Sequence, residues 1–217
     1  MKDAVTQVRE LANGFRVTLN DRSSLRLTRA DQRTLALREG DRVNEAELRH
    51  TLLLSQYPAA LNRAVRLLAV RARSCYEIEK RLADACYLDD TVEMVLEKLR
   101  GEGFVNDAAF AAQWAGDRSA RQIGSARILY ELRQKGVDEA IARQAVEALE
   151  DKRQAESAAA LAAKLWKRYR AYPVADARRK AMAAMQRRGY AYAEAERALH
   201  CATDADGADG AYDDEDL

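Results

Sequence analysis

The sequence predicts an all-α protein of three tandem three-helix repeats, elongated and curved, preceded by a small N-terminal β-hairpin and helix module. Only two prolines interrupt 217 residues that are rich in Ala, Leu, Arg and Glu. These side chains favour helices because they lose little rotamer freedom there. Apolar residues recur at helical spacing from Pro58 onward. A pattern of apolar and turn residues also recurs three times along the chain.

The first segment, residues 1–57, is expected to form the N-terminal module. Apolar and polar residues alternate in residues 15–19 and again in residues 25–27. This alternation predicts two strands of a β-hairpin, joined by the polar residues between them. Thr28 and Asn44 each stand three positions before an acidic residue, so they are expected to cap two helices.

The helical repeats are expected to begin at Pro58. In the first repeat, Ser74 starts a capping box that opens the second helix, and Asp90 is expected to open the third. A short acidic tail is expected to follow the last repeat. The expected boundaries are residues 58–105, 106–150 and 151–202 for the three repeats and 203–217 for the tail.

The internal repeat places Cys86, Gly136 and Gly189 at equivalent turns, 50 and 53 residues apart. Apolar residues stand eight and four positions before each turn, and one and ten positions after it. The first two share a helix face, and glycine suits the left-handed residue that ends a helix. Cys86 is not glycine, so its turn is expected to differ in geometry. A helical bundle without repeats is the alternative. The matched positions are Ile78, Leu82, Tyr87 and Leu96, then Ile128, Leu132, Val137 and Val146, then Ala181, Met185, Tyr190 and Leu199.

The net charge of +1 conceals an uneven distribution of charge. Residues 201–217 contain seven acidic and no basic side chains, whereas the other 200 residues carry 36 basic and 28 acidic ones, a net charge of +8. Within these, residues 151–200 alone carry +7. The third repeat is therefore expected to be the most basic part of the chain. The tail is expected to be disordered and to aid solubility; alternatively, it folds back on the third repeat and competes with a partner.

The sequence offers no catalytic, metal or cofactor motif. Three cysteines and two histidines lack metal-ligand spacing, and no phosphate-binding or nucleophile motif occurs. No apolar run approaches the length of a membrane span or signal peptide. We expect a non-enzymatic, cytoplasmic monomer without cofactors, metal or membrane contact. An enzyme with a carboxylate site hidden among the helices is one alternative.

Basic side chains gather in sets that predict a binding surface. Such sets attract phosphates or acidic protein surfaces, although a solvated helix face is the plain alternative. Trp166 and Tyr172 are candidates for stacking on bases, but are expected to serve packing. The candidate contacts are Arg71, Arg73, Arg118, Arg121, Lys164, Lys167, Arg168, Arg178, Arg179, Arg187 and Arg188.

Several motifs in residues 59–200 together resemble the RecX family of recombination regulators. They comprise residues 71–82, with Arg71-Ala72-Arg73-Ser74; residues 103–124, with Gly103-Phe104-Val105-Asn106-Asp107; residues 131–137; and Arg187-Arg188-Gly189-Tyr190. The resemblance implies three three-helix repeats.

The same resemblance implies a function in DNA repair, homologous recombination and the SOS response. It implies binding to the RecA filament on single-stranded DNA, with duplex DNA as a further ligand. Binding would inhibit or modulate filament extension, ATPase, strand exchange and co-protease activity. The alternative is a DNA- or RNA-binding repeat module that acts without RecA.

Overall fold

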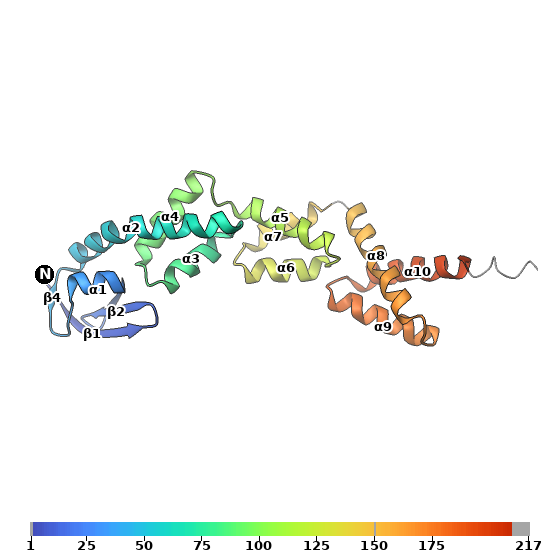
Figure 1. The fold of residues 1–217 in the computed structure, drawn as a ribbon, viewed down its shortest axis with the longest axis horizontal. Coiled ribbons are helices and arrows are strands. Elements are labelled where there is room, and N and C mark those ends of the chain that lie inside the picture. The colour runs from blue at the N-terminus through green and yellow to red at the C-terminus, as the bar shows by residue number, and fades with distance from the viewer. Residues whose placement is uncertain (1, 150, 210–217) are drawn as a thin grey trace, which may run out of the picture. The chain divides into compact units, whose positions relative to one another are not determined.

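The computed structural model describes residues 2–149 and 151–209 (Figure 1). The chain divides into two compact units, Met1–Asp107 and Ala108–Leu217. The first unit holds the N-terminal module and the first repeat, and the second unit holds the other two repeats. Among the described residues, no helix is long and apolar enough to cross a membrane.

The N-terminal module contains an antiparallel sheet with strand order β3-β2-β1-β4. The predicted hairpin is present: β2 (Gly14–Leu19) pairs with β3 (Ser23–Thr28), and Val17 lies opposite Leu25. Asn20 and Asp21 adopt positive φ in the turn, a conformation that Asn and Asp tolerate better than most residues.

Two further strands were not predicted. β1 (Asp3–Leu11) pairs along β2, and the short β4 (Arg42–Val43) pairs with the start of β1. A bulge between Val5 and Gln7 shifts the register of β1. A bulge breaks the two-residue alternation of side chains, so the sequence pattern of β1 is obscured.

Both predicted helix caps of the module are confirmed. Thr28 and Asp31 form a capping box at the start of α1 (Arg29–Leu35). Asn44 accepts hydrogen bonds from two backbone N–H groups at the start of α2 (Glu45–Val70).

Helix α2 continues through Pro58, where the first repeat is expected to begin. Leu48 and Leu52 pack in the core of the module, whereas Ala60 and Ala64 pack in the core of the first repeat. Because apolar residues before and after the proline are buried in these two cores, a single continuous helix is favoured. Pro58 lies on the exposed side, where water can bind the backbone carbonyl that proline leaves without an N–H donor.

The first repeat is completed by α3 (Cys75–Asp84) and α4 (Asp89–Gly101). Ser74 caps α3 as predicted. The predicted start of α4 at Asp90 is wrong: Leu88 holds the N-cap position and no side chain caps this helix. Asp90 instead pairs with Arg49 of α2, at 3.1 Å.

The second and third repeats each contain three helices (Figure 1). Phe110, Ala111 and Ala115 lie in the core of the second repeat, and Leu161 and Ala162 lie in that of the third. The helices are α5 (Asp107–Ala120), α6 (Ser125–Gln134), α7 (Glu139–Glu147), α8 (Asp151–Tyr169), α9 (Val174–Arg187) and α10 (Tyr192–Asp209).

The internal repeat is confirmed, since every matched apolar position is buried. The expectation of a different turn at Cys86 is wrong. Cys86, Gly136 and Gly189 all have positive φ, at 61°, 69° and 90°. In each turn, the next residue donates its N–H to the carbonyl of the residue five positions before it, so the three turns are closed by equivalent hydrogen bonds. The closing hydrogen bonds therefore hold Cys86 in the left-handed region despite its side chain.

Pairs of alanines form a further repeat that was not predicted. Each pair is four residues apart on the first helix of its repeat, and each alanine is at most 1% exposed. Small side chains at this spacing form one narrow stripe, which lets the neighbouring helices approach closely. The pairs are Ala60 and Ala64, Ala111 and Ala115, and Ala158 and Ala162.

The expected tail boundary at residue 203 falls inside α10, which runs to Asp209. His200 Nδ1 lies 2.6 Å from Asp204 Oδ2, one helical turn away, a spacing that lets the two side chains meet on the helix surface. The rest of the expected tail, residues 210–217, lies outside the described residues.

Candidate binding surfaces

The exposed face of α8 carries the most prominent set of predicted contacts. Lys164, Lys167 and Arg168 are exposed, and their spacing places them on one side of the helix. We call these three residues the basic ridge. Leu161 and Leu165 on the other side are buried in the core of the third repeat. The amphipathic pattern of α8 therefore orients the ridge toward solvent.

An aromatic pair links the end of α8 to α9. The rings of Tyr169 and Tyr172 lie 6.3 Å apart. The guanidinium of Arg168 lies 5.7 Å from the Tyr169 ring, and Lys180 Nζ lies 3.3 Å from the Tyr172 ring. A cation over an aromatic face is attracted by the electrons of the ring, so these contacts order part of the surface.

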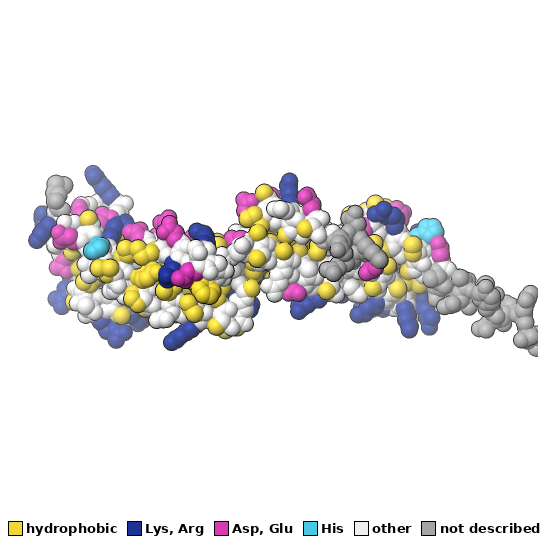
Figure 2. Space-filling model, turned by 90° about the horizontal axis from the view of Figure 1, so that it is seen from above, with side chains coloured by type: hydrophobic (Ala, Val, Ile, Leu, Met, Phe, Trp, Pro, Cys, Tyr) yellow, Lys and Arg dark blue, Asp and Glu magenta, His cyan; other side chains and the backbone are white. Residues whose placement is uncertain are grey.

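Helix α9 presents predicted contacts at both of its ends. Arg178 and Arg179 lie near its start, and Arg179 pairs with Asp176 at 2.8 Å. Arg187 and Arg188 lie at its end and are exposed. Figure 2 shows Lys and Arg side chains projecting along one edge of the part of the chain that α8–α10 form.

Of the two predicted stacking residues, Trp166 is buried, at 9% exposed. It therefore serves packing, as expected. Tyr172 is 48% exposed, and its ring is covered by Lys180 on one side.

Predicted contacts outside the third repeat are largely engaged within the protein. Both terminal nitrogens of Arg71 donate to Glu77 at 2.9 Å, and this bonding raises the pKa of Arg71. Arg73 donates to the carbonyl of Leu67 at 3.0 Å. Burial lowers the pKa of Arg73, and the charge of Arg71 lowers it further. Both arginines thus stabilise the connection between α2 and α3.

Arg118 belongs to a cluster around Trp114 in the second repeat. Its guanidinium lies 4.5 Å from the Trp114 ring, and Lys135 Nζ lies 4.1 Å from that ring. Arg118 Nε is 2.7 Å from Glu131 Oε2, although it lacks the alignment of a hydrogen bond. Arg121, in contrast, is exposed and has no ion pair with a described residue. Arg118 is thus engaged within the second repeat, whereas Arg121 is accessible to a partner.

Four arginines of the first unit line a single cleft, and two of them, Arg16 and Arg26, were not predicted as part of a basic set. Arg16 comes from β2, Arg26 from β3, Arg63 from α2 and Arg81 from α3. Arg63 and Arg81 were recognisable as basic helix residues. Arg16 and Arg26 gave no signal, since an isolated arginine in a strand is ordinary.

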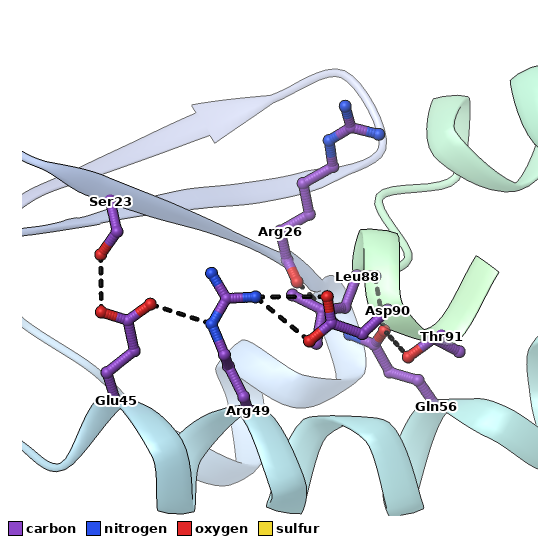
Figure 3. Close-up of polar contacts among 8 residues, drawn as sticks. All are labelled: Ser23, Arg26, Glu45, Arg49, Gln56, Leu88, Asp90 and Thr91. Carbon is purple, nitrogen blue, oxygen red and sulfur yellow. Dashed lines mark hydrogen bonds and ion pairs between the residues drawn. The ribbon is translucent and has the colours of Figure 1, made fainter. Parts of the chain in front are cut away.

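Polar contacts fix the N-terminal module to the first repeat (Figure 3). Glu45 on α2 accepts from Ser23 at 2.8 Å and from Arg49 at 2.9 Å. These bonds hold the pKa of Glu45 below its ordinary value, the Ser23 bond contributing most. Arg49 also reaches Asp90 on α4. Strand β3 is therefore joined through α2 to the first repeat.

The described residues contain no group of three or more His, Cys, Asp or Glu side chains placed to hold a metal ion. What the structure does present is exposed cationic side chains on stacked helices. The fold and these surfaces define a helical-repeat protein whose accessible chemistry suits an anionic macromolecule.

Family models describe the three repeats individually. The first, second and third three-helix domains of RecX match residues 60–99, 106–146 and 151–199. The chain belongs to the RecX family.

Curated relatives and solved structures agree with this assignment. "Regulatory protein RecX" of Corynebacterium efficiens is 39% identical over 103 residues, which cover 47% of this chain and 49% of that protein. The protein of the same name in Limosilactobacillus reuteri is 29% identical over 155 residues, covering 71% and 59%. The chain thus spans about half the length of the curated relatives that it matches.

Two crystal structures share the fold. One, of regulatory protein RecX, has a TM-score of 0.62 at 24% identity, covering 89% of this chain and 97% of that one. The other, of RecX from Lactobacillus salivarius, has a TM-score of 0.65 at 23% identity, covering 69% and 98%.

Proposed function

We propose that this protein binds the RecA filament on single-stranded DNA and inhibits or modulates filament extension, ATPase, strand exchange and co-protease activity. It acts by binding and not by catalysis, as a cytoplasmic monomer in recombination, DNA repair and the SOS response. Membership of a family of regulatory proteins supports this function.

The basic ridge is the observation that supports this proposal, and its three side chains are the proposed contacts with the filament. Lys164, Lys167 and Arg168 are exposed and have no ion pair with any described residue, and the guanidinium of Arg168 lies near the ring of Tyr169. Cations without internal partners are available to acidic protein surfaces and to DNA phosphates. Arg178, Arg187 and Arg188 of α9 extend the proposed contact region.

A charge-reversal experiment tests the ridge. The variant K164E/K167E/R168E is expected to require at least about tenfold more protein for half-inhibition of the RecA ATPase on single-stranded DNA. Three exposed ion pairs of roughly 0.5 kcal/mol each account for this factor, and the new repulsion adds to it.

A matched control variant distinguishes the loss of specific contacts at the ridge from a general effect of the changed net charge. The variant R22E/R38E/R66E makes the same change of six charge units at exposed sites of the first unit, and it is expected to inhibit nearly as well as the wild type. Full inhibition by the ridge variant would reject the ridge as a contact surface.

The alternative function, direct nucleic-acid binding without RecA, is favoured by the number of free arginines. Co-sedimentation with RecA, with and without single-stranded DNA, distinguishes the two. A nucleic-acid module would bind DNA with a steep salt dependence and gain nothing from RecA. A RecA regulator is expected to bind the filament more tightly than bare DNA.

A further inference from the structure

A cleft of about 500 Å³ lies in the first unit, where the sheet meets α2 and α3. Four arginines from four different elements line it: Arg16, Arg26, Arg63 and Arg81. The acidic side chain in its lining is Asp84. Arg26 pairs with Asp89 at 3.2 Å. Arg16, Arg63 and Arg81 have no ion pair with a described residue, so the cleft carries surplus positive charge.

The strand register forces like charges together on one face of the sheet. Arg16 lies directly opposite Arg26 on β3 and directly opposite Arg9 on β1. Directly opposed residues share a face, and like charges placed there destabilise the sheet. The arginines cannot move to the other face, because Val17 and Leu25 fill the core on that side. An anion bound over this row would relieve the repulsion.

The walls of the cleft are held together by close packing. A Cβ on Gly14 would lie 2.6 Å from Cys86 Cβ, so only glycine lets this end of the sheet approach the turn after α3. Asn13 Nδ2 donates to the carbonyl of Asp84 at 2.8 Å. The hairpin and α3 therefore keep a fixed separation, and the arginines are preorganised for a ligand.

The charges of Arg26 and Arg16 also act on the Cys86 thiol, which lines the cleft. Burial raises the pKa of Cys86, and these two guanidinium groups partly oppose that effect. Both side chains line the cleft together with this thiol.

We propose that this four-arginine cleft binds a phosphodiester group of a nucleic-acid strand. Planar guanidinium groups donate two parallel hydrogen bonds to phosphate oxygens, and several of them converge here. The cationic row continues beyond the cleft to Arg9, which is exposed. A row that extends past the pocket fits the successive phosphates of a strand better than one small anion.

The test uses the full chain and a labelled oligothymidylate, with no RecA present. Fluorescence anisotropy at several salt concentrations gives the affinity and its salt slope. The variant R63E/R81E is expected to bind at least about tenfold more weakly at low salt. Its slope should fall by about 0.7 to 1.4, which corresponds to one or two lost phosphate contacts.

A control variant on the same two helices is matched in charge. Arg66 on α2 and Lys80 on α3 are exposed and lie outside the cleft lining. R66E/K80E also changes four charge units, and it is expected to keep the wild-type slope. Equal losses in both variants would overturn the proposal, since net charge would then explain binding. The milder R63Q/R81Q should show the same direction of change, and thermal melts check that all variants fold.

Competition with tripolyphosphate tests whether the ligand of the cleft is a nucleic-acid strand or a small phosphate compound. It is expected to compete with the oligonucleotide for the wild type. If tripolyphosphate binds the cleft but R63E/R81E leaves oligonucleotide affinity unchanged, the strand proposal is wrong. Because RecA is absent, failure here leaves the proposed RecA function standing. If the ridge variant inhibits the RecA ATPase as well as the wild type does, the ridge is rejected as a contact surface, but the proposal for the cleft is unaffected.

Discussion

Gln56 is a buried side chain that connects several elements of the first unit (Figure 3). It is 2% exposed. Its amide nitrogen donates to Asp31 at 2.8 Å, and its oxygen accepts from the backbone N–H of Leu88 at 2.7 Å and from Thr91 at 3.3 Å. One side chain thus binds α1 and the start of α4, which compensates for the missing side-chain cap of α4.

Replacing Gln56 by leucine is expected to destabilise the protein by about 2–4 kcal/mol. The similar shape leaves little cavity, so the loss reflects buried polar groups left without partners, each costing roughly 1–3 kcal/mol. Urea denaturation followed by circular dichroism measures it. Asn62→Leu is the control, because Asn62 lies exposed on the same helix and should change stability by less than about 0.5 kcal/mol. A stable Q56L protein would contradict this role of the network.

At the scale of the elements, the turns after α3 and α9 serve as docking points. In the second unit, Gly124 at the start of α6 lies against the turn at Gly189. Gly124 donates its N–H to the carbonyl of Arg188 at 2.8 Å, and the N–H of Ala126 lies 3.3 Å from the carbonyl of Gly189. Gly14 lies against the turn at Cys86 in a comparable way. Glycine at these places permits backbone contact between neighbouring elements.

Gly124→Ala is expected to destabilise the second unit by about 2 kcal/mol or more. The added Cβ would lie 2.4 Å from backbone atoms of Gly189, and such overpacking forces the backbone apart. Both tryptophans, Trp114 and Trp166, lie in this unit, so their fluorescence in urea reports its unfolding.

Gly116→Ala is the matched control for this glycine. Gly116 lies within α5, and nothing lies within 4 Å of a Cβ there. Alanine should therefore stabilise the helix by about 0.5–1 kcal/mol. Equal behaviour of the two alanine variants would refute the docking role of Gly124.

At the scale of the whole molecule, negative charge is concentrated in the last residues of the sequence. Residues 210–217 contain four acidic side chains and no basic ones. Removing them raises the formal net charge from +1 to +5 and leaves α10 (Tyr192–Asp209) in place.

Deleting residues 210–217 is expected to increase the affinity for an oligonucleotide several-fold at low salt. The effect should vanish near 1 M salt, where charges are screened beyond roughly 3 Å. Anisotropy titrations at both salt concentrations measure it. An unchanged affinity at low salt would show that these carboxylates do not compete with the ligand.

The sequence alone determined the helical repeats, the hairpin and the basic character of the third repeat. Burial at a fixed spacing leaves a local pattern, so Ile78, Ile128 and Ala181 could be aligned without coordinates. The ridge was equally predictable, because residues three and four apart on one helix always share a face.

Only the tertiary structure decided which cations are free and where they converge. Arg71 and Arg118 were predicted contacts, yet the fold pairs them with Glu77 and Glu131. Arg16 and Arg81 are 65 residues apart, and strand register and the packing of α3 bring them to one cleft. Ion pairs and clefts depend on distances between segments remote in the chain, whereas periodicity depends only on neighbours.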